Sequence, residues 1–431
     1  NAAKYASSGS NHRRAQLYAR ATLGELDTEA LRMEICDKRN KDKLRAYSLL
    51  PATMDEAKER YLFFQQFLKE SKKFGAQRIA SEKKAVEIAM SNLAMNAGYS
   101  DVMRLTLRME TKLLDDMKEL FEEAEVEDVT VRLNVDESGK AELVCTKAGK
   151  ELKSVPAKLK KHEYILRLNE SRKKLTEQYK RTRLMLEQAM EDETEFTVEE
   201  IMTLHLNPVA KALVKNLVFM CDGNVGFLWE NILTDYAGFE HSLNSEDRVK
   251  VAHPVHLYRD GHWPEYQKVL FEKQMIQPFK QVFRELYVKT EEETELNYSR
   301  RYSGNQIQPQ KTVACLKGRR WVADVEDGLQ KIYYKENIAA RIFALADWFS
   351  PSDIEAPTLE CVEFYDRSTW QSLKIKDIPE VIFSEVMRDV DLAVSVAHAG
   401  GVDPETSHST VEMRAALLTC ILPLLKLTNV T

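Results

Sequence analysis

The segment Val129–Cys145, VTVRLNVDESGKAELVC, decides the fold class because the hydrophobic period of the chain changes there. Apolar and polar side chains alternate over residues 129–135 and again over 141–145, which is the period of a half-buried strand. The stretch DESG at 136–139 separates the two runs and is typical of a hairpin loop. The sequence therefore predicts a β-hairpin insertion over residues 128–156, with a third short strand near its end.

The chain before this insertion, residues 1–127, has helical periodicity throughout. Tyr61, Phe64 and Phe67 recur at three-residue spacing, and similar runs follow them at 86–93 and 105–117. Near Gly98 the pattern breaks, and Ser100 or Asp101 is a candidate cap for the helix that follows. Successive helices with short breaks predict a helical, solenoid-like region.

After the insertion, residues 157–216 form a long-helix segment. Apolar residues at three- and four-residue spacing predict one helix over Ala157–Asp192. Thr197 and Glu200 have the spacing of a capping box, which starts a shorter helix. Pro208 is well placed to begin the next one.

Residues 217–431 are predicted to be a mixed α+β domain that is truncated at its C-terminus. Its strands are expected at Leu217–Met220, Val225–Leu228 and Cys361–Tyr365, with further short strands over 296–335. Its helices are expected at Trp263–Tyr287 with a kink at Pro278, at Ile338–Phe349, from Pro379 to Gly400-Gly401, and at Val411–Leu427. The predicted fold class is α+β and helix-dominant: a helical stack followed by a domain with short hairpins and small sheets.

The composition excludes several classes of protein. The chain has 431 residues, of which 44% are hydrophobic and 30% charged, so it has enough apolar material for a large core. Its longest nearly unbroken apolar run, Ala415–Leu425, is shorter than the ~20 residues that span a bilayer. The six cysteines are scattered, which fits a cytoplasmic protein with reduced thiols and predicts neither a zinc site nor a disulfide scaffold. The chain begins at Asn1 without Met, so we expect it to be a segment of a longer protein.

The common catalytic and nucleotide-binding motifs are missing from the sequence. It contains no phosphate-binding glycine loop, no dinucleotide fingerprint, no nucleophile elbow and no kinase signature. We therefore expect no cofactor and no metal.

The predicted helix over Ala157–Asp192 is rich in basic residues. They can be a ridge that contacts nucleic-acid phosphates, or a solvated helix face with ion pairs between neighbouring turns. The second interpretation is favoured, because acidic residues are interleaved with the basic ones and the net charge of the chain is −6. The candidate nucleic-acid contacts are Arg172, Lys173, Lys174, Lys180, Arg181 and Arg183.

A polar stripe runs along the predicted helix after Pro379. Arg388, Asp391, Ser395 and His398 fall within one narrow arc of the helical wheel, with Glu385 at its edge. Because the helix is apolar nearly all round, an Arg–Asp pair there is partly buried and must serve either a structural network or a binding site. If the stripe meets the polar residues of 253–304, the result is a pocket that suits an anion. Its candidate residues are His253, Gln277, Arg284, Glu285, Arg301, Arg388, Asp391 and His398.

Several long runs of the sequence resemble a bacterial domain of unknown function. The runs are His253-Pro254, Gln277–Tyr287 (QPFKQVFRELY), Arg301–Gly304, Ser384–His398 (SEVMRDVDLAVSVAH), Lys147–Pro156 (KAGKELKSVP) and Val402–Arg414. This domain is carried by proteins described as molybdate-metabolism regulators, often beside a WGR domain. The resemblance covers most of the chain from about residue 60, and it implies no established activity. It also implies a continuation of the domain, as a short β segment, beyond Thr431.

These observations leave three hypotheses for the function. The first is a non-catalytic interaction or scaffold module of a larger cytoplasmic bacterial protein, with protein partners or other domains of the same chain. The second is a nucleic-acid-associated module that uses the basic helix at 158–183. The third is an enzyme or anion-binding sensor built on the Arg/Glu/Asp/His pocket. A membrane partner is not expected.

Overall fold

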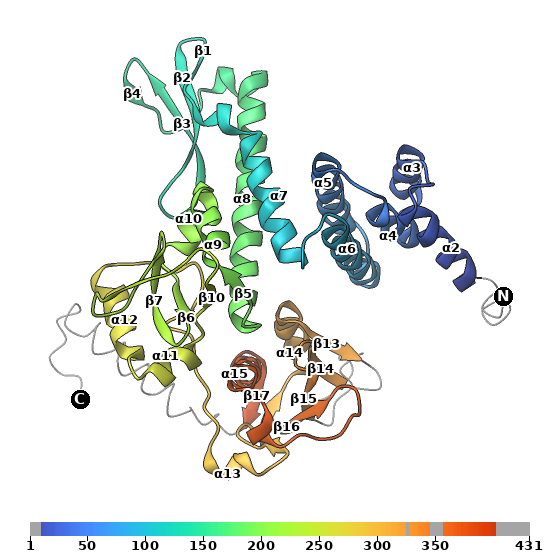
Figure 1. The fold of residues 1–431 in the computed structure, drawn as a ribbon, viewed down its shortest axis with the longest axis vertical. Coiled ribbons are helices and arrows are strands. Elements are labelled where there is room, and N and C mark those ends of the chain that lie inside the picture. Colours follow the sequence, from blue (N-terminus) through green and yellow to red (C-terminus); the bar gives the residue numbers. More distant parts are fainter. Residues whose placement is uncertain (1–9, 325–327, 345–356, 402–431) are drawn as a thin grey trace. The chain divides into compact units, whose positions relative to one another are not determined.

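The structure is a computed structural model that describes residues 10–324, 328–344 and 357–401. It confirms the predicted α+β class, since a run of helices precedes domains built on small antiparallel sheets (Figure 1). The chain forms two compact units. The first unit is Asn1–Thr182 with Asn207–Ala210, and the second unit is Arg183–Leu206 with Lys211–Thr431.

The first unit begins with helices that pack on a shared apolar core. As predicted, Asp101 caps a helix, and its carboxylate accepts a hydrogen bond from the backbone N–H of Arg104. Thr53 and Glu56 form a capping box that starts another. The helices are α2 (Ser10–Thr22), α3 (Thr28–Lys38), α4 (Lys41–Leu49), α5 (Met54–Ser71), α6 (Ala76–Asn96) and α7 (Val102–Asp115).

The two strands predicted over residues 129–145 are confirmed, and they belong to a four-stranded antiparallel sheet of order β1-β2-β3-β4. Val131 lies opposite Cys145, so the alternating apolar side chains of the two strands point to the same face of the sheet. At the turn, Asp136 accepts hydrogen bonds from the backbone N–H groups of Ser138 and Lys140. The strands are β1 (Ala124–Val126), β2 (Val129–Val135), β3 (Ala141–Lys147) and β4 (Lys150–Glu151).

The long helix α8 (Glu163–Glu191) belongs to both units, because the first unit ends within it at Thr182. In the first unit, its apolar side chains join the core of the β1–β4 sheet. A buried polar triad also connects α5, α7 and α8: Glu110 accepts hydrogen bonds from Tyr61 Oη at 2.5 Å and from Arg181 Nη2 at 2.7 Å. The arginine charge compensates the buried carboxylate.

The second unit contains a six-stranded antiparallel sheet of order β5-β10-β6-β7-β8-β9. The predicted capping box of Thr197 and Glu200 and the predicted helix start at Pro208 are both confirmed. The strands are β5 (Glu195–Thr197), β6 (Val218–Cys221), β7 (Asn224–Trp229), β8 (Ile232–Thr234), β9 (Glu240–Ser242) and β10 (Arg248–Val251). The helices are α9 (Val198–His205), α10 (Pro208–Val214), α11 (Pro254–Asp260) and α12 (Trp263–Glu272).

A second antiparallel sheet of the same unit has the order β11-β16-β15-β14-β13, and α15 packs on one of its faces (Figure 1). Its strands are β11 (Tyr298–Ser299), β13 (Trp321–Asp324), β14 (Gly328–Tyr333), β15 (Ile338–Ala344) and β16 (Leu359–Asp366). The remaining elements are α13 (Glu291–Thr294), α14 (Pro309–Leu316), η3 (Lys317–Arg319), α15 (Glu380–Ala397) and the paired strands β12 (Asn305–Ile307) and β17 (His398–Gly401).

Several predicted helices differ from the structure in whole or in part. The helix predicted over Ala157–Asp192 begins only at Glu163, after a short 3-10 helix over Ala157–Leu159. The described part of Ile338–Phe349 is strand β15, whose residues pair with β14 and β16 on both sides. A short apolar run fits a buried strand as well as a helix, and here the two neighbouring strands favoured the strand.

The helix predicted over Trp263–Tyr287 ends at Glu272, because backbone groups of the following segment form hydrogen bonds with side chains instead. The last helix ends at Ala397 rather than at the glycines, and the helix predicted over Val411–Leu427 lies outside the described residues.

Candidate functional site

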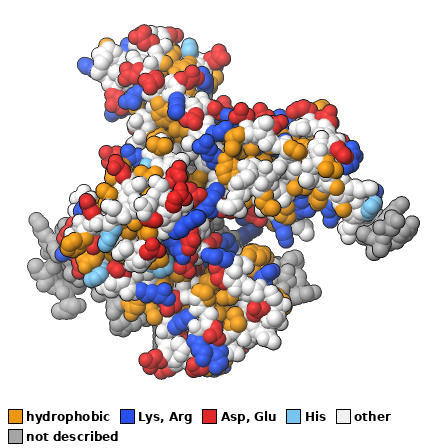
Figure 2. All heavy atoms as spheres, in the orientation of Figure 1, with side chains coloured by type: hydrophobic (Ala, Val, Ile, Leu, Met, Phe, Trp, Pro, Cys, Tyr) orange, Lys and Arg blue, Asp and Glu red, His pale blue; other side chains and the backbone are white. Residues whose placement is uncertain are grey.

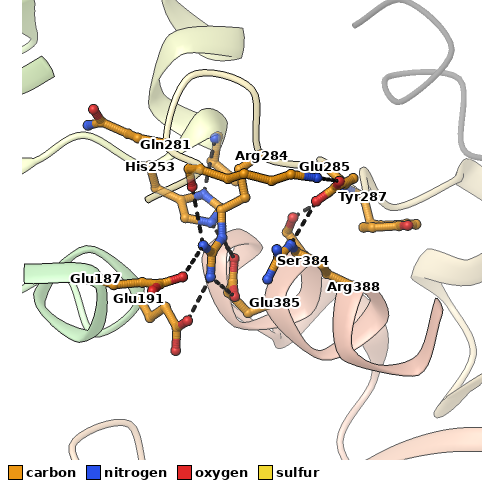
Figure 3. Close-up of polar contacts among 12 residues, drawn as sticks. Glu187, Glu191, His253, Gln281, Arg284, Glu285, Tyr287, Ser384, Glu385 and Arg388 are labelled. Atoms are coloured by element: carbon orange, nitrogen blue, oxygen red, sulfur yellow. Dashed lines mark hydrogen bonds and ion pairs between the residues drawn. The ribbon is translucent and has the colours of Figure 1, made fainter. Parts of the chain in front are cut away.

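Arg284 is the centre of a buried polar network in the second unit (Figure 3). Its side chain is fully buried, and the guanidinium donates two parallel hydrogen bonds of 2.7 Å to the carboxylate of Glu385. The same group also donates to Glu191 Oε1 at 2.6 Å and to Glu187 Oε1 at 2.9 Å. Bidentate pairing with further hydrogen bonds is the geometry in which a buried ion pair is best compensated.

Three elements that are distant in sequence supply this network. Glu187 and Glu191 are four residues apart near the end of α8, so they lie on one helix face. Glu385 lies on α15, 101 residues from Arg284. Arg284 itself lies in the segment between α12 and α13 that the sequence predicted to be helical.

Two glutamine side chains explain why that segment is not a helix. The buried amide of Gln281 accepts from Val218 N–H at 3.0 Å and donates to the carbonyl oxygens of Val218 and Ala252. It thereby bridges β6 and the end of β10 as a peptide group would. Gln277 donates to Gln281 and accepts from Val282 N–H at 3.0 Å. These bonds hold the loop against the six-stranded sheet and aim Arg284 at the carboxylates.

His253 extends the network to the start of α11. Its Nδ1 accepts a hydrogen bond from the backbone N–H of Val255 at 3.2 Å, which caps the helix. The proton of the neutral ring is therefore on Nε2, which donates to Glu385 Oε1 at 2.9 Å. His256 lies one turn later, and its Nε2 is 3.2 Å from Glu193 Oε1.

The electrostatics of the network keep a charged Arg284–Glu385 pair beside a neutral imidazole. Burial raises the pKa of Glu385, but the charge of Arg284 and the hydrogen bond from His253 outweigh it and hold this pKa well below its usual value. Burial lowers the pKa of His253 and so favours its neutral form. Burial and the nearby charge of Glu385 raise the pKa of Glu191.

A second buried charge cluster lies between α15 and the five-stranded sheet. Asp389 is fully buried and accepts hydrogen bonds from Lys331 Nζ at 2.9 Å, Trp321 Nε1 at 2.9 Å and Arg319 Nη1 at 3.0 Å. Burial lowers the pKa of Lys331, but its charged surroundings outweigh this effect and raise the pKa above its usual value. The lysine is thus a buried cation that depends on Asp389.

The structure brings together part of the pocket predicted from the sequence. His253, Gln277 and Arg284 belong to the network described above, and Glu285 lies beside it, paired with Arg388 at 3.0 Å. Asp391 accepts a hydrogen bond from Tyr287 Oη at 2.5 Å.

Arg301 does not join the network. Arg301 donates to Val288 O at 2.9 Å and pairs with Glu293. The backbone of His398 lies in β17, opposite Ile307, and its side chain is outside the described part of the structure.

Sequence reasoning missed four central residues: Glu187, Glu191, Lys331 and Asp389. Glu187 and Glu191 carry the one usable signal, an acidic pair at four-residue spacing near the end of the helix. Lys331 sits in an apolar strand, and nothing in the sequence identifies Asp389 as its partner. Such pairs are defined only when the strand and the helix pack together.

Arg388 provides a test of the role of the stripe. Burial raises the pKa of Glu285, but the hydrogen bond from Lys280 and the charge of Arg388 outweigh it and lower the pKa to about 2. A folded-state pKa below the unfolded value gives stability that is present above about pH 4.5 and is lost as the pH falls toward 2. We expect Arg388→Gln to lower the free energy of unfolding by about 1.5–3 kcal/mol at neutral pH. The difference from wild type should shrink between about pH 4.5 and 2.

Urea titrations of both proteins across this pH range measure the effect. Loss of stability would place Arg388 in a structural network, as the contacts indicate. A variant as stable as wild type at every pH would instead leave this arginine available for a ligand.

A cavity of about 270 Å³ opens next to the network. It lies between the last turns of α8 and the end of α14 with η3. Its walls are Leu184, Glu187, Gln188, Glu191, Cys315, Gly318, Arg319 and Arg320. Glu187 and Glu191 thus have one side toward Arg284 and another toward this cavity.

The basic residues of α8 are largely paired with acidic groups. Lys174 pairs with Glu170 at 2.9 Å and Lys180 with Glu177 at 3.2 Å, as expected for ion pairs between successive turns. Arg181 instead belongs to the buried triad with Glu110, and Arg183 donates to the carbonyl oxygen of Pro278 at 2.6 Å. Acidic and basic side chains are interspersed on the face shown in Figure 2. These contacts favour the solvated-face interpretation of the helix.

Within the described ranges, three or more His, Cys, Asp or Glu side chains nowhere come together as a group that could hold a metal ion. Among the helices that the structure describes, none combines the length and the apolar character needed to cross a membrane.

Comparison with known families gives two matches. Residues 1–109 match the model described as "Family of unknown function (DUF5724)", and residues 149–321 match the model described as "Domain of unknown function (DUF4132)". No curated protein and no solved structure matched the chain. The matches support the coarser part of the resemblance, which is to domains of unknown function.

Proposed function

We propose that this chain is a non-catalytic interaction module of a larger cytoplasmic bacterial protein. The observation that carries the proposal is the outer face of the five-stranded sheet, the face opposite α15. This outer face combines exposed apolar side chains with arginines that lie over aromatic rings. Aromatic residues and arginine are the side chains that protein interfaces favour at their energetic centres.

The strand register defines the outer face. Tyr298, Glu363, Arg341, Gln330 and Val322 lie opposite one another in adjacent strands, so they form one row on one side of the sheet. The neighbouring row across the same strands points the other way and belongs to the core with α15.

Exposed apolar residues lie in this row, elsewhere on the same strands and just beyond the strand ends. Val322 is 59% exposed and Phe343 43%, and near the strand ends Tyr334 is 73% and Trp370 43% exposed. Arginines lie over aromatic rings at 4.9–5.6 Å in three pairs: Arg300 over Tyr298, Arg341 over Tyr365 and Arg367 over Tyr334. Exposed apolar side chains and arginines over aromatic rings are the kinds of group that protein-binding surfaces use.

The buried network supports a structural rather than a catalytic role for the polar residues. Arg284 donates to three carboxylates of its own chain, and Asp389 accepts three hydrogen bonds. These hydrogen bonds connect α8, α15 and the two sheets of the unit, and they thereby fix the position of the sheet that carries the outer face.

The experiment compares variants of the outer face in the full chain. Val322→Glu with Phe343→Glu places two charges on the outer face. Leu206→Glu with Ile276→Glu is the matched control, since both leucine and isoleucine are about 80% exposed and lie outside that sheet. Proteins retained by the immobilised wild-type chain from its native source are identified, and each purified partner is then titrated.

We expect a protein that binds wild type and control alike and binds the outer-face variant at least about 30-fold more weakly, the effect of losing an interface hot spot. Equal binding of that protein to all three chains would contradict the proposal.

A further inference from the structure

The cavity between α8 and η3 has unused hydrogen-bond donors on one side. In the described part of the chain, Arg319 uses only Nη1, which donates to Asp389 at 3.0 Å. Its Nε and Nη2 therefore remain available, and the side chain is 27% exposed at the cavity wall. A guanidinium edge with two parallel donors matches a carboxylate.

The other side of the cavity carries unused acceptors. Glu187 accepts from Arg284 with Oε1, while its Oε2 lies 3.7 Å from Arg183 Nη2, beyond a good hydrogen bond. The half-buried amide of Gln188 has no hydrogen-bond partner among the residues that the structure describes. These groups suit a ligand ammonium, which is a donor of up to three hydrogen bonds.

The charges around the cavity select against a ligand with a net charge. Arg319 and Arg320 repel a simple cation, and Glu187 and Glu191 repel a simple anion. A small molecule that carries both charges satisfies both walls at once. Arg320, whose φ is 70°, donates hydrogen bonds to Glu191 and Asp192 and is therefore already paired, so Arg319 and Glu187 are the charged groups that keep hydrogen-bonding atoms open to a ligand.

The size and the remaining lining limit the ligand further. A volume of about 270 Å³ is just below the range of about 300–1,000 Å³ for drug-sized ligands. Leu184, Cys315 and Gly318 add a small and less polar part to the wall. We propose that this cavity binds a free α-amino acid, whose carboxylate accepts from Arg319 and whose ammonium donates to Glu187.

Titration of the full chain with each of the common amino acids tests the proposal. Unfolding is followed by tryptophan fluorescence, which reports the second unit because every tryptophan lies at or after Trp229. We expect at least one amino acid to stabilise this unit and to bind by calorimetry. Its N-acetyl derivative and its methyl ester, which each lose one charge, should bind about 10- to 100-fold more weakly.

Two variants separate binding in the cavity from binding elsewhere. Leu184→Trp enlarges a side chain that lines the cavity and removes no ion pair, because leucine is uncharged; we expect it to abolish binding. Leu166→Trp is the matched control, an exposed leucine of the same helix that does not line the cavity, and it should bind as wild type does. Glu187→Gln should weaken the binding of the free amino acid but not the binding of its N-acetyl derivative.

Three results would overturn the assignment. They are no binding by any amino acid, equal binding of the charge-deleted derivatives, and unchanged binding by Leu184→Trp. None of them bears on the outer-face proposal, which is tested with different variants.

Discussion

Replacing Arg284 with methionine is expected to lower the free energy of unfolding of the second unit by about 3–5 kcal/mol. Methionine fills a comparable volume, so the main loss is electrostatic. The substitution removes the bidentate partner of the fully buried Glu385. It also removes the arginine that Glu187 and Glu191 accept hydrogen bonds from. An uncompensated buried carboxylate costs more than the pair contributed.

Urea unfolding followed by tryptophan fluorescence measures this loss in the second unit, which holds all the tryptophans. Arg259→Met is the matched control, because Arg259 also pairs with a glutamate of α15, Glu380, at 2.8 Å, but both partners are about half exposed. We expect the control to change the free energy by no more than about 1 kcal/mol. Equal effects of the two substitutions would show that the Arg284 network is not a stabilising feature.

The second large effect is expected at Asp389. Asp389→Leu should destabilise the second unit by about 3–5 kcal/mol, because it leaves Lys331 as a buried cation without its carboxylate. It also removes the acceptor of Trp321 Nε1. Burial of an unpaired donor adds to the cost.

A double variant separates the charge from the packing. Lys331→Met with Asp389→Asn removes both charges and keeps an acceptor for Trp321, so we expect it to recover most of the lost stability. The comparison is made in the same urea experiment. If the double variant is as unstable as Asp389→Leu, the loss comes from packing at this position, and the ion pair is not its cause.

Both predictions have a consequence for function. The two networks connect α8, the loop around Arg284, α15 and the five-stranded sheet. The cavity uses Arg319, Glu187 and Glu191 from these same networks. An occupant of the cavity therefore contacts the residues that stabilise the sheet whose outer face we propose as the docking surface.

Local signals in the sequence determined the elements that they specify. The alternation and the loop over 129–145 gave the hairpin, and Thr197 with Glu200 gave a helix start, because each of these signals lies within a few residues. Helical and strand periods likewise identified the α+β class. The sequence also predicts Arg284 as a candidate, because on a helix it would project away from the apolar stripe of Phe279, Val282, Phe283 and Leu286.

Only the tertiary structure determined which residues pair with Arg284. Glu385 lies 101 residues from Arg284, and Asp389 lies 58 residues from Lys331, so no local pattern relates them. The same is true of β15, whose apolar run became a strand because β14 and β16 offered hydrogen bonds on both sides. Side-chain periodicity records which face of an element is buried, whereas packing determines what that face meets.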